Sequence, residues 1–401
     1  KDSKLLYFYG AMDKETGEGL NAQRYRAYGE TEQDSFDIQL KGDYQLFNQQ
    51  HEFVIGAISS KQDIATDSYT PIGGDMSSGY DRVDIDNFYQ WGNLAEPEWE
   101  ATPVRAEDVS IKQTGVYAVT RLSATDKLKF ILGGRLSSWD REGIWYGAAE
   151  DYGNSGTFVP YVGALYDLTS QHRLYASYTE IFLPQSVRDS SGQMLDPIVG
   201  ESTEIGLKGE YFDGRLNASA AVFQIKQDNL GQSTGVLIDP NNPVGGYAYE
   251  ASEGATSKGF ELEVSGELAT DWNASVGYTQ FTAEDAKGDN VNTLYPTKLL
   301  RTFTTYRLPG ALNKLTIGGG VNWQDSIYTY ATNPAGNPEK IQQDAYALVN
   351  LMARYEITDN LSAQLNADNV TDQKYFDVFD AYGALTYGAP RSFTASAKYK
   401  F

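Results

Sequence analysis

The stretch 258–280, KGFELEVSGELATDWNASVGYTQ, alternates apolar and polar side chains on both sides of a short turn. Phe260 and Leu262 share one parity, and Glu261 and Glu263 share the other. Two period-2 segments joined by a turn of Ala, Thr and Asp are typical of an antiparallel β-hairpin. The pattern therefore predicts a pair of strands with one apolar face and one charged face.

The same hairpin pattern recurs along the chain. Further short turns are predicted at 48–50, 124–126, 212–214 and 358–360. Longer polar connectors lie near 64–105, 144–156, 184–198, 232–253, 284–297, 329–343 and 371–388. Short turns and long connectors alternate, and in a closed up-and-down sheet this places all the turns at one rim and all the loops at the other.

The predicted strands are long enough to cross a lipid bilayer. We count about 17 strands, many of them longer than the roughly 5–6 residues of an average soluble strand. A tilted strand of about 9–11 residues crosses the hydrocarbon of a bilayer. The predicted fold is therefore all-β: a transmembrane antiparallel up-and-down β-barrel with long extracellular loops and short periplasmic turns.

A barrel with an apolar outside and a polar inside also accounts for a mean hydropathy of -0.46, because half of each strand faces water. The residues expected to face lipid are Phe260, Leu262, Val264, Leu315, Ile317, Val321, Ala363, Leu365, Ala367, Phe158, Val162, Ala164 and Tyr166. Those expected to line the lumen are Glu261, Glu263, Glu267, Gln364, Asn366, Asp368, Lys127, Lys129, Arg135, Arg354 and Arg391. The default role of these charges is structural, since solvated ion pairs contribute little individually.

Composition excludes several classes of protein. The chain has no cysteine, which removes disulfides, thiolate metal sites and cysteine nucleophiles. Its net charge of -22 argues against a nucleic-acid partner. No run of 18 apolar residues occurs, so no transmembrane helix is expected, and the first residues do not show the basic and apolar regions typical of a signal peptide. A soluble all-β protein such as a β-propeller is a further alternative. It is disfavoured, because propeller strands are short and the sequence shows no blade repeat.

Catalysis is not expected. His51 and His172 are the only imidazoles, and both fall in short turns, far from the long loops. Pairs of carboxylates that could serve a glycosidase recur on every strand, so none stands out. We therefore predict no enzyme activity and no resident metal or cofactor.

Several stretches resemble one family. YASYTEIFLPQS (175–186), DPIVGESTEIGLKGEYFDGRLNASAAVFQIKQDNL (196–230), DNVTDQKYF (368–376) and the terminal YGAPRSFTASAKYKF are similar to TonB-dependent outer-membrane receptors for ferric siderophores. The similarity is greatest to the hydroxamate type, which includes the coprogen and ferripyoverdine receptors. The motifs are spread over most of the chain in family order.

The resemblance implies an outer-membrane importer in a Gram-negative bacterium, with a barrel of about 22 strands filled by an N-terminal plug that contacts TonB. Residues 1–401 would then be the C-terminal part of the barrel, without the plug and the first strands. The odd strand count supports this expectation, because bacterial single-chain barrels close with an even number of strands. The implied partners are a ferric siderophore, the TonB complex, outer-membrane lipid and lipopolysaccharide, and the barrel assembly machinery. A passive porin, or a TonB-dependent receptor for another ligand, is the alternative.

Aromatic residues fall into two predicted groups. A girdle at the lipid–water boundary would contain Trp272, Tyr278, Trp323, Tyr355, Tyr399 and Phe401. Within it, the terminal Tyr399 and Phe401 resemble the signal by which outer-membrane barrels are recognised for assembly.

The second group would hold the ligand. A siderophore already fills the coordination sphere of its iron, so the receptor needs only stacking faces and hydrogen-bonding groups in a concave mouth. The residues that meet this requirement are Tyr89, Trp91, Trp99, Trp139, Arg141, Trp145, Tyr146, Asn322, Gln324, Tyr328 and Tyr330. We expect a subset including Trp91, Trp139 and Tyr328 to line the mouth.

Overall fold

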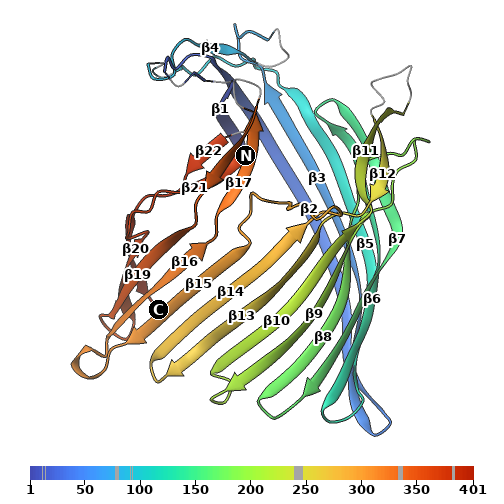
Figure 1. The fold of residues 1–401 in the computed structure, drawn as a ribbon, viewed down its shortest axis with the longest axis vertical. Helices are drawn as coiled ribbons and strands as arrows, with labels where there is room; N and C mark the ends of the chain where they lie inside the picture. The colour runs from blue at the N-terminus through green and yellow to red at the C-terminus, as the bar shows by residue number, and fades with distance from the viewer. Residues whose placement is uncertain are drawn as a thin grey trace.

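The chain folds almost entirely into β-strands (Figure 1). The computed structural model describes residues 1–10, 12–13, 15–76, 81–90, 92, 94–238, 247–332, 337–381 and 384–401. Within these ranges the only helical element is the 3-10 turn η2, Gly310–Leu312. No helix among these residues is long and apolar enough to cross a membrane.

The main sheet has 17 strands with antiparallel pairings. Its members are β1 (Asp2–Gly10), β2 (Leu20–Leu46), β3 (Gln49–Tyr69), β4 (Val83–Ile85), β5 (Val104–Ser123), β6 (Leu128–Trp145), β7 (Ala148–Asp167), β8 (His172–Leu183), β9 (Ile198–Tyr211), β10 (Leu216–Asp228), β13 (Thr256–Ala269), β14 (Trp272–Glu284), β15 (Lys298–Arg307), β16 (Leu315–Gln324), β19 (Tyr346–Glu356), β20 (Leu361–Asp368) and β23 (Ser392–Tyr399). Each pairs with the next member along the chain, except that β3 pairs with β5 and the short β4 pairs with β2. The up-and-down order predicted from the sequence is confirmed.

Three small hairpins lie in segments that the sequence predicted as long loops. They are β11 (Leu230–Leu237) with β12 (Tyr247–Ser252), β17 (Ile327–Thr332) with β18 (Pro338–Gln343), and β21 (Phe376–Ala381) with β22 (Ala384–Tyr387). In Figure 1 all three lie away from the rim that carries the short turns. The two rims therefore differ, as the alternation of connectors predicted.

Two connectors differ from the prediction. The turn placed at 48–50 is formed by Phe47 and Asn48, whose φ angles of 53° and 58° close the tight link between β2 and β3. The predicted loop 144–156 is largely strand, because β6 and β7 continue outward to a turn at Tyr146 and Gly147. The turns near 124–126, 212–214 and 358–360 lie between strands as expected.

Large apolar side chains on one face of the sheet are exposed in the structure. Phe36, Ile38 and Leu40 on β2 have exposed fractions of 65%, 59% and 64%. The predicted lipid-facing residues align across strands in the same way, with Ile317 opposite Ala353 and Leu136 opposite Phe158. A continuous apolar surface of this size is stable against hydrocarbon and not against water. On the lumen side, Lys127 departs slightly from the prediction, because it lies in the turn before β6.

The two ends of the sheet are unpaired on one side. Among the described residues, β1 pairs only with β2, and β23 pairs only with β20. Figure 1 shows the sheet curving, so that the blue strands lie behind the yellow and orange ones. The structure is thus a long arc of barrel wall with two free edges.

Gly266 on β13 gives a test of the hairpin geometry. Its φ is +138°, and a Cβ at this position would lie 2.0 Å from the backbone oxygen of Arg215. We expect Gly266→Ala to lower the unfolding free energy of the complete barrel by about 2 kcal/mol or more, because a strained φ and a backbone clash act together. Denaturant unfolding in lipid vesicles measures this change.

Gly277→Ala on β14 is the matched control. A Cβ on Gly277 meets nothing within 4 Å, and this residue pairs with Glu263 and Arg301 in the same hairpin system. Equal stability of the two alanine variants would contradict the strained backbone and the close approach to Arg215 at Gly266.

Candidate functional site: the inner wall and its extracellular rim

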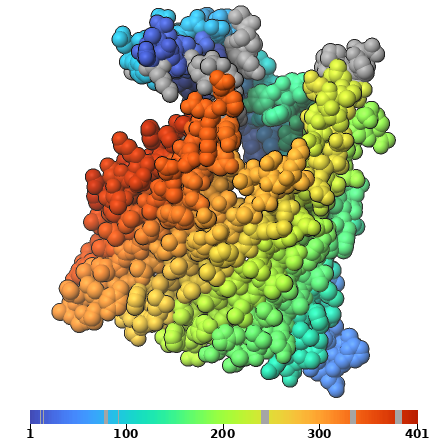
Figure 2. Space-filling view, viewed as in Figure 1, coloured from blue at the N-terminus to red at the C-terminus, as the bar shows by residue number. Residues whose placement is uncertain are grey.

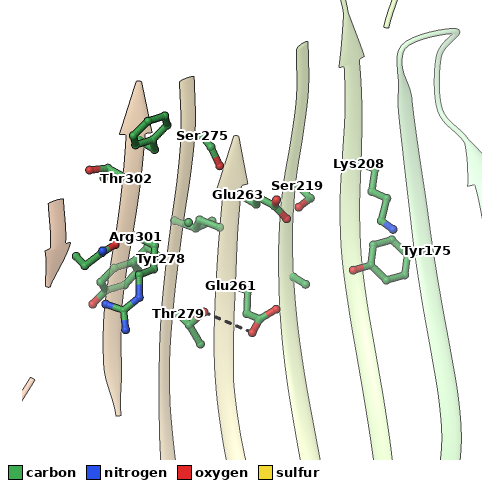
Figure 3. Close-up of a pocket in the computed structure, with 15 residues that line it drawn as sticks. Tyr175, Lys208, Ser219, Glu261, Glu263, Ser275, Tyr278, Thr279, Arg301 and Thr302 are labelled. Carbon is green, nitrogen blue, oxygen red and sulfur yellow. Dashed lines mark hydrogen bonds between the residues drawn. The ribbon is translucent and has the colours of Figure 1, made fainter. Parts of the chain in front are cut away.

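The inner face of the middle strands forms a polar hollow of about 500 Å³ (Figure 3). Lys208, Glu261, Glu263 and Arg301 line it from β9, β13 and β15. The Thr279 hydroxyl donates to a Glu261 carboxylate oxygen at 3.4 Å. This wall of mixed charge can hydrogen-bond water or a domain that fills the lumen, which agrees with the structural role expected for these residues.

Aromatic and charged residues continue up β6 toward the rim. The ring of Trp139 lies 5.4 Å from that of Tyr152 on β7, measured between centroids. Arg141 forms an ion pair with Glu150, and both side chains are only 17% exposed. The Trp139 ring is thus packed against Tyr152, and the charge of Arg141 is neutralised by Glu150.

At the top of β6, Trp145 and Tyr146 stand in the tight turn. The indole N–H of Trp145 donates to Glu107 Oε1 at 2.8 Å, and the two rings meet edge-on at 5.6 Å. Tyr146 has φ 46°, in the left-handed region, as the tight turn between β6 and β7 requires. The Tyr146 hydroxyl lies 3.5 Å from the hydroxyl of Tyr25 on β2.

Tyr25 completes this cluster from the start of the chain. Its hydroxyl is 3.4 Å from the Ser68 hydroxyl, and its ring lies 6.3 Å from that of Tyr7 on β1. The neighbouring Tyr25 hydroxyl, together with burial, raises the pKa of Tyr146 above its ordinary value. An ordinary tyrosine is already neutral at physiological pH, and the raised pKa keeps the Tyr146 hydroxyl protonated in more alkaline solution as well.

Sequence reasoning found Trp145 and Tyr146 but missed Tyr7, Tyr25 and Tyr152. Tyr25 and Tyr146 are separated by 121 positions, so no local pattern could join them. The alternation of side chains along β2, a strand of 27 residues, could have identified Tyr25. Tyr25 lies between Arg24 and Arg26, so its side chain points to the opposite face of the strand from theirs.

The second predicted group lies on β16 and the β17–β18 hairpin. Asn322 is paired with Arg301, and Gln324 with Leu299. Tyr328 and Tyr330 meet edge-on at 5.9 Å, and Lys340 Nζ lies 4.1 Å from the centre of the Tyr328 ring. Strands β7 to β15 separate this group from β6, so the two groups form opposite stretches of the rim and not one contiguous patch.

The predicted loop residues lie against the start of the chain. The indole N–H of Trp99 donates to Glu96 Oε1 at 3.2 Å, and Glu96 is paired with Lys4 at 2.6 Å. A Cβ on Gly17 would lie 2.8 Å from the ring of Tyr89, so the two are in close contact. Trp91 is outside the described residues.

The two histidines form hydrogen bonds next to the short turns. The backbone N–H of Ser123 donates to His51 Nδ1 at 3.0 Å, which leaves Nε2 to donate to the Leu46 carbonyl oxygen at 3.0 Å. His172 contacts the hydroxyls of Thr169 and Tyr211. Both side chains have structural partners at the short-turn rim, as predicted. The part of the chain that the structure describes contains no group of three or more metal-ligating side chains.

Comparison with known proteins adds an independent observation. The family model described as "TonB dependent receptor-like, beta-barrel" matches residues 3–370. The ferripyoverdine receptor of Pseudomonas aeruginosa is 41% identical over 95% of this chain and 46% of its own length. The ferric-pyoverdine BN7/BN8 receptor of Pseudomonas putida is 39% identical over 96% of this chain and 46% of its own length.

Solved structures agree with these relatives. The ferripyoverdine receptor of P. aeruginosa bound to ferripyoverdine superposes with a TM-score of 0.88 at 38% identity, covering 100% of this chain and 52% of that chain. The FpvAI–pyocin S2 complex gives a TM-score of 0.89 at 38% identity, covering 100% of this chain and 51% of that chain. The chain spans about half the length of the relatives it matches.

Proposed function

Because the chain belongs to the TonB-dependent receptor β-barrel family, we propose that it forms the C-terminal barrel wall of a receptor that binds and imports a ferric siderophore. The observation that carries this proposal is 41% identity to a ferripyoverdine receptor over 95% of the chain. Within the hydroxamate-type receptors indicated by the motifs, this similarity favours a ligand of the pyoverdine class.

Members of this family are outer-membrane proteins of Gram-negative bacteria, so this chain is an outer-membrane protein as well. The proposed domain organisation adds a plug and further strands N-terminal to residues 1–401. Two observations support it: the relatives are about twice as long, and the described edges of β1 and β23 each lack a second strand. Further strands would close the arc, and a plug would occupy the polar lumen.

The proposed transport cycle needs little chemistry from the chain itself. Iron arrives as cargo inside its chelator, so the receptor uses no resident cofactor and is not an enzyme. Energy would come from the TonB complex through the plug. The barrel assembly machinery would recognise Tyr399 and Phe401 and insert the barrel into the outer membrane. There the barrel would contact lipid and lipopolysaccharide.

In this proposal the ligand contacts the extracellular rim of the inner wall. Trp139 and Trp145 offer ring faces on β6, Tyr146 offers a ring and a hydroxyl in the turn that follows, and Tyr328 offers a ring on the opposite stretch. Stacking and hydrogen bonds of this kind suit the outside of an organic iron complex. A passive porin would need no such rings, although its lumen would be equally polar.

Iron-limited growth tests the proposal. A strain without its own siderophore receptors is given the complete gene that encodes this chain and a panel of ferric pyoverdines as the sole iron source. We expect growth on at least one ferric pyoverdine, and loss of that growth when TonB is deleted, because import requires energy. Growth that is independent of TonB would indicate a porin, and growth only on an unrelated ligand would overturn the ligand class.

A further inference from the structure

The long connector between β3 and β5 folds back over β1 and β2. Within it, β4 pairs with residues 20–22 of β2, and the Phe88 N–H donates to the Gly17 carbonyl oxygen at 2.8 Å. The rings of Phe8 and Phe88 meet edge-on at 5.5 Å. In Figures 1 and 2 this segment forms the cap above the first strands, coloured blue to cyan. The connector is therefore attached to the wall and does not stand free of it.

One buried ion pair secures this attachment. Asp81 in the connector is 2% exposed, and Arg24 on β2 is 20% exposed. Arg24 Nε donates to Asp81 Oδ2 at 2.8 Å and Nη2 donates to Oδ1 at 3.0 Å, while the Arg24 backbone N–H also reaches Oδ2 at 3.1 Å. A two-point contact of this type fixes direction as well as distance.

The connector is shaped to hold Asp81 there. A Cβ on Gly74 would lie 2.4 Å from Asp81 Oδ1, so a glycine lets the chain approach the carboxylate closely. Asp75 and Arg82, on either side, are joined by a β-bridge with an N–H to O distance of 2.9 Å. The buried carboxylate is thus held by its own loop and by β2 together.

Strand geometry connects this pair to the inner wall. Successive side chains of a strand point to opposite faces, so Tyr25 points away from both Arg24 and Arg26. Arg26 is held on the same side as Arg24, by Asp2 at 3.2 Å and by the ring of Tyr69 at 4.6 Å. On the other side, Tyr25 contacts Ser68, Tyr7 and Tyr146.

We propose that Arg24 and Asp81 are a positioning pair, which fixes the top of β2 from outside and so holds Tyr25 against Tyr146 in the ligand-binding rim. The inference rests on the proposed function for its effect on siderophore affinity. Its structural half, the control of β2 by the connector, stands separately. Neither residue of the pair touches the ligand.

Hydrogen–deuterium exchange on the complete receptor tests the structural half. Asp81→Asn removes the charge while keeping the shape, and we expect amide exchange at residues 22–26 to accelerate at least tenfold. Asp84→Asn is the matched control, because Asp84 lies in the same connector and forms an exposed pair with Arg82 at 3.0 Å. Equal exchange in the two variants would overturn the proposal.

Arg24→Lys provides a graded variant in case Asp81→Asn does not fold. Lysine keeps the positive charge and loses the two-point contact. We expect intermediate acceleration at residues 22–26, and wild-type exchange in this variant would count against the pair.

Binding of ferric pyoverdine tests the functional half through a double-mutant cycle with Tyr25→Phe. We expect Asp81→Asn to weaken binding at least fivefold in the wild-type background and less than twofold in the Tyr25→Phe background, because both changes disturb one contact. Additive losses would show that the pair acts on the rim by another route and would overturn the positioning role. If the wild-type receptor binds no ferric pyoverdine, the proposed ligand class fails, and the exchange result alone decides the control of β2.

Discussion

Arginine in place of Leu262 is expected to keep the receptor out of the outer membrane, whereas arginine in place of the adjacent Glu263 is expected to be tolerated. Leu262 is 48% exposed and lies opposite Ala220 and Tyr278 on neighbouring strands. An arginine at the middle of the lipid-facing surface costs about 2–4 kcal/mol in a transmembrane barrel. Glu263 lines the polar hollow of the lumen, where a positive charge stays hydrated.

The measurement is the amount of folded receptor in isolated outer membranes, detected by its heat-modifiable migration in a gel. We expect Leu262→Arg to leave less than a tenth of the wild-type amount and Glu263→Arg to leave most of it. Because the two sites are adjacent, they share the same strand, depth and local register. The reverse order of the two variants would invert the assignment of the faces.

Removal of the β6 rings is expected to cause the largest loss of ligand binding. In the complete receptor, we expect simultaneous replacement of Trp139, Trp145 and Tyr146 by alanine to weaken ferric pyoverdine binding at least tenfold. Large aromatic side chains carry much of the energy of such contacts, and a few of them dominate. Fluorescence titration of the purified receptor measures the dissociation constant.

Trp272→Ala with Tyr355→Ala is the control for this experiment. Both residues belong to the predicted aromatic girdle. Trp272 is 44% exposed, and its indole N–H donates to the Thr304 hydroxyl at 2.8 Å. Their loss is expected to leave affinity within twofold of the wild type. If the girdle variant and the rim variant lose affinity equally, the effect belongs to barrel stability and the rim is not the binding site.

The period-2 pattern was sufficient to predict the fold because strand faces and tight turns are local properties. Leu262 and Glu263 could be assigned to opposite faces from their neighbours alone, and the turn at Asp271 could be found from its residue types. The family motifs then identified the TonB-dependent receptor family, which the comparisons confirm.

The parts that the sequence could not predict depend on contacts between distant segments. Arg24 and Asp81 are 57 positions apart, and their pairing follows from how a connector folds over the wall. The connector 144–156 was expected to be a loop because it is polar, yet strands that extend beyond the membrane face water on both sides and are polar for that reason. The predicted ligand residues remain predictions, and the structure adds which of them lie together: Trp145 with Tyr146, and Tyr328 with Tyr330.

A structure of the complete receptor with ferric pyoverdine bound would test the proposed binding site directly. We predict a plug inside the barrel and the iron complex bound at the extracellular rim, in contact with Trp139, Trp145 and the Tyr25–Tyr146 pair. A lumen without a plug, or a ligand bound away from these rings, would contradict this prediction.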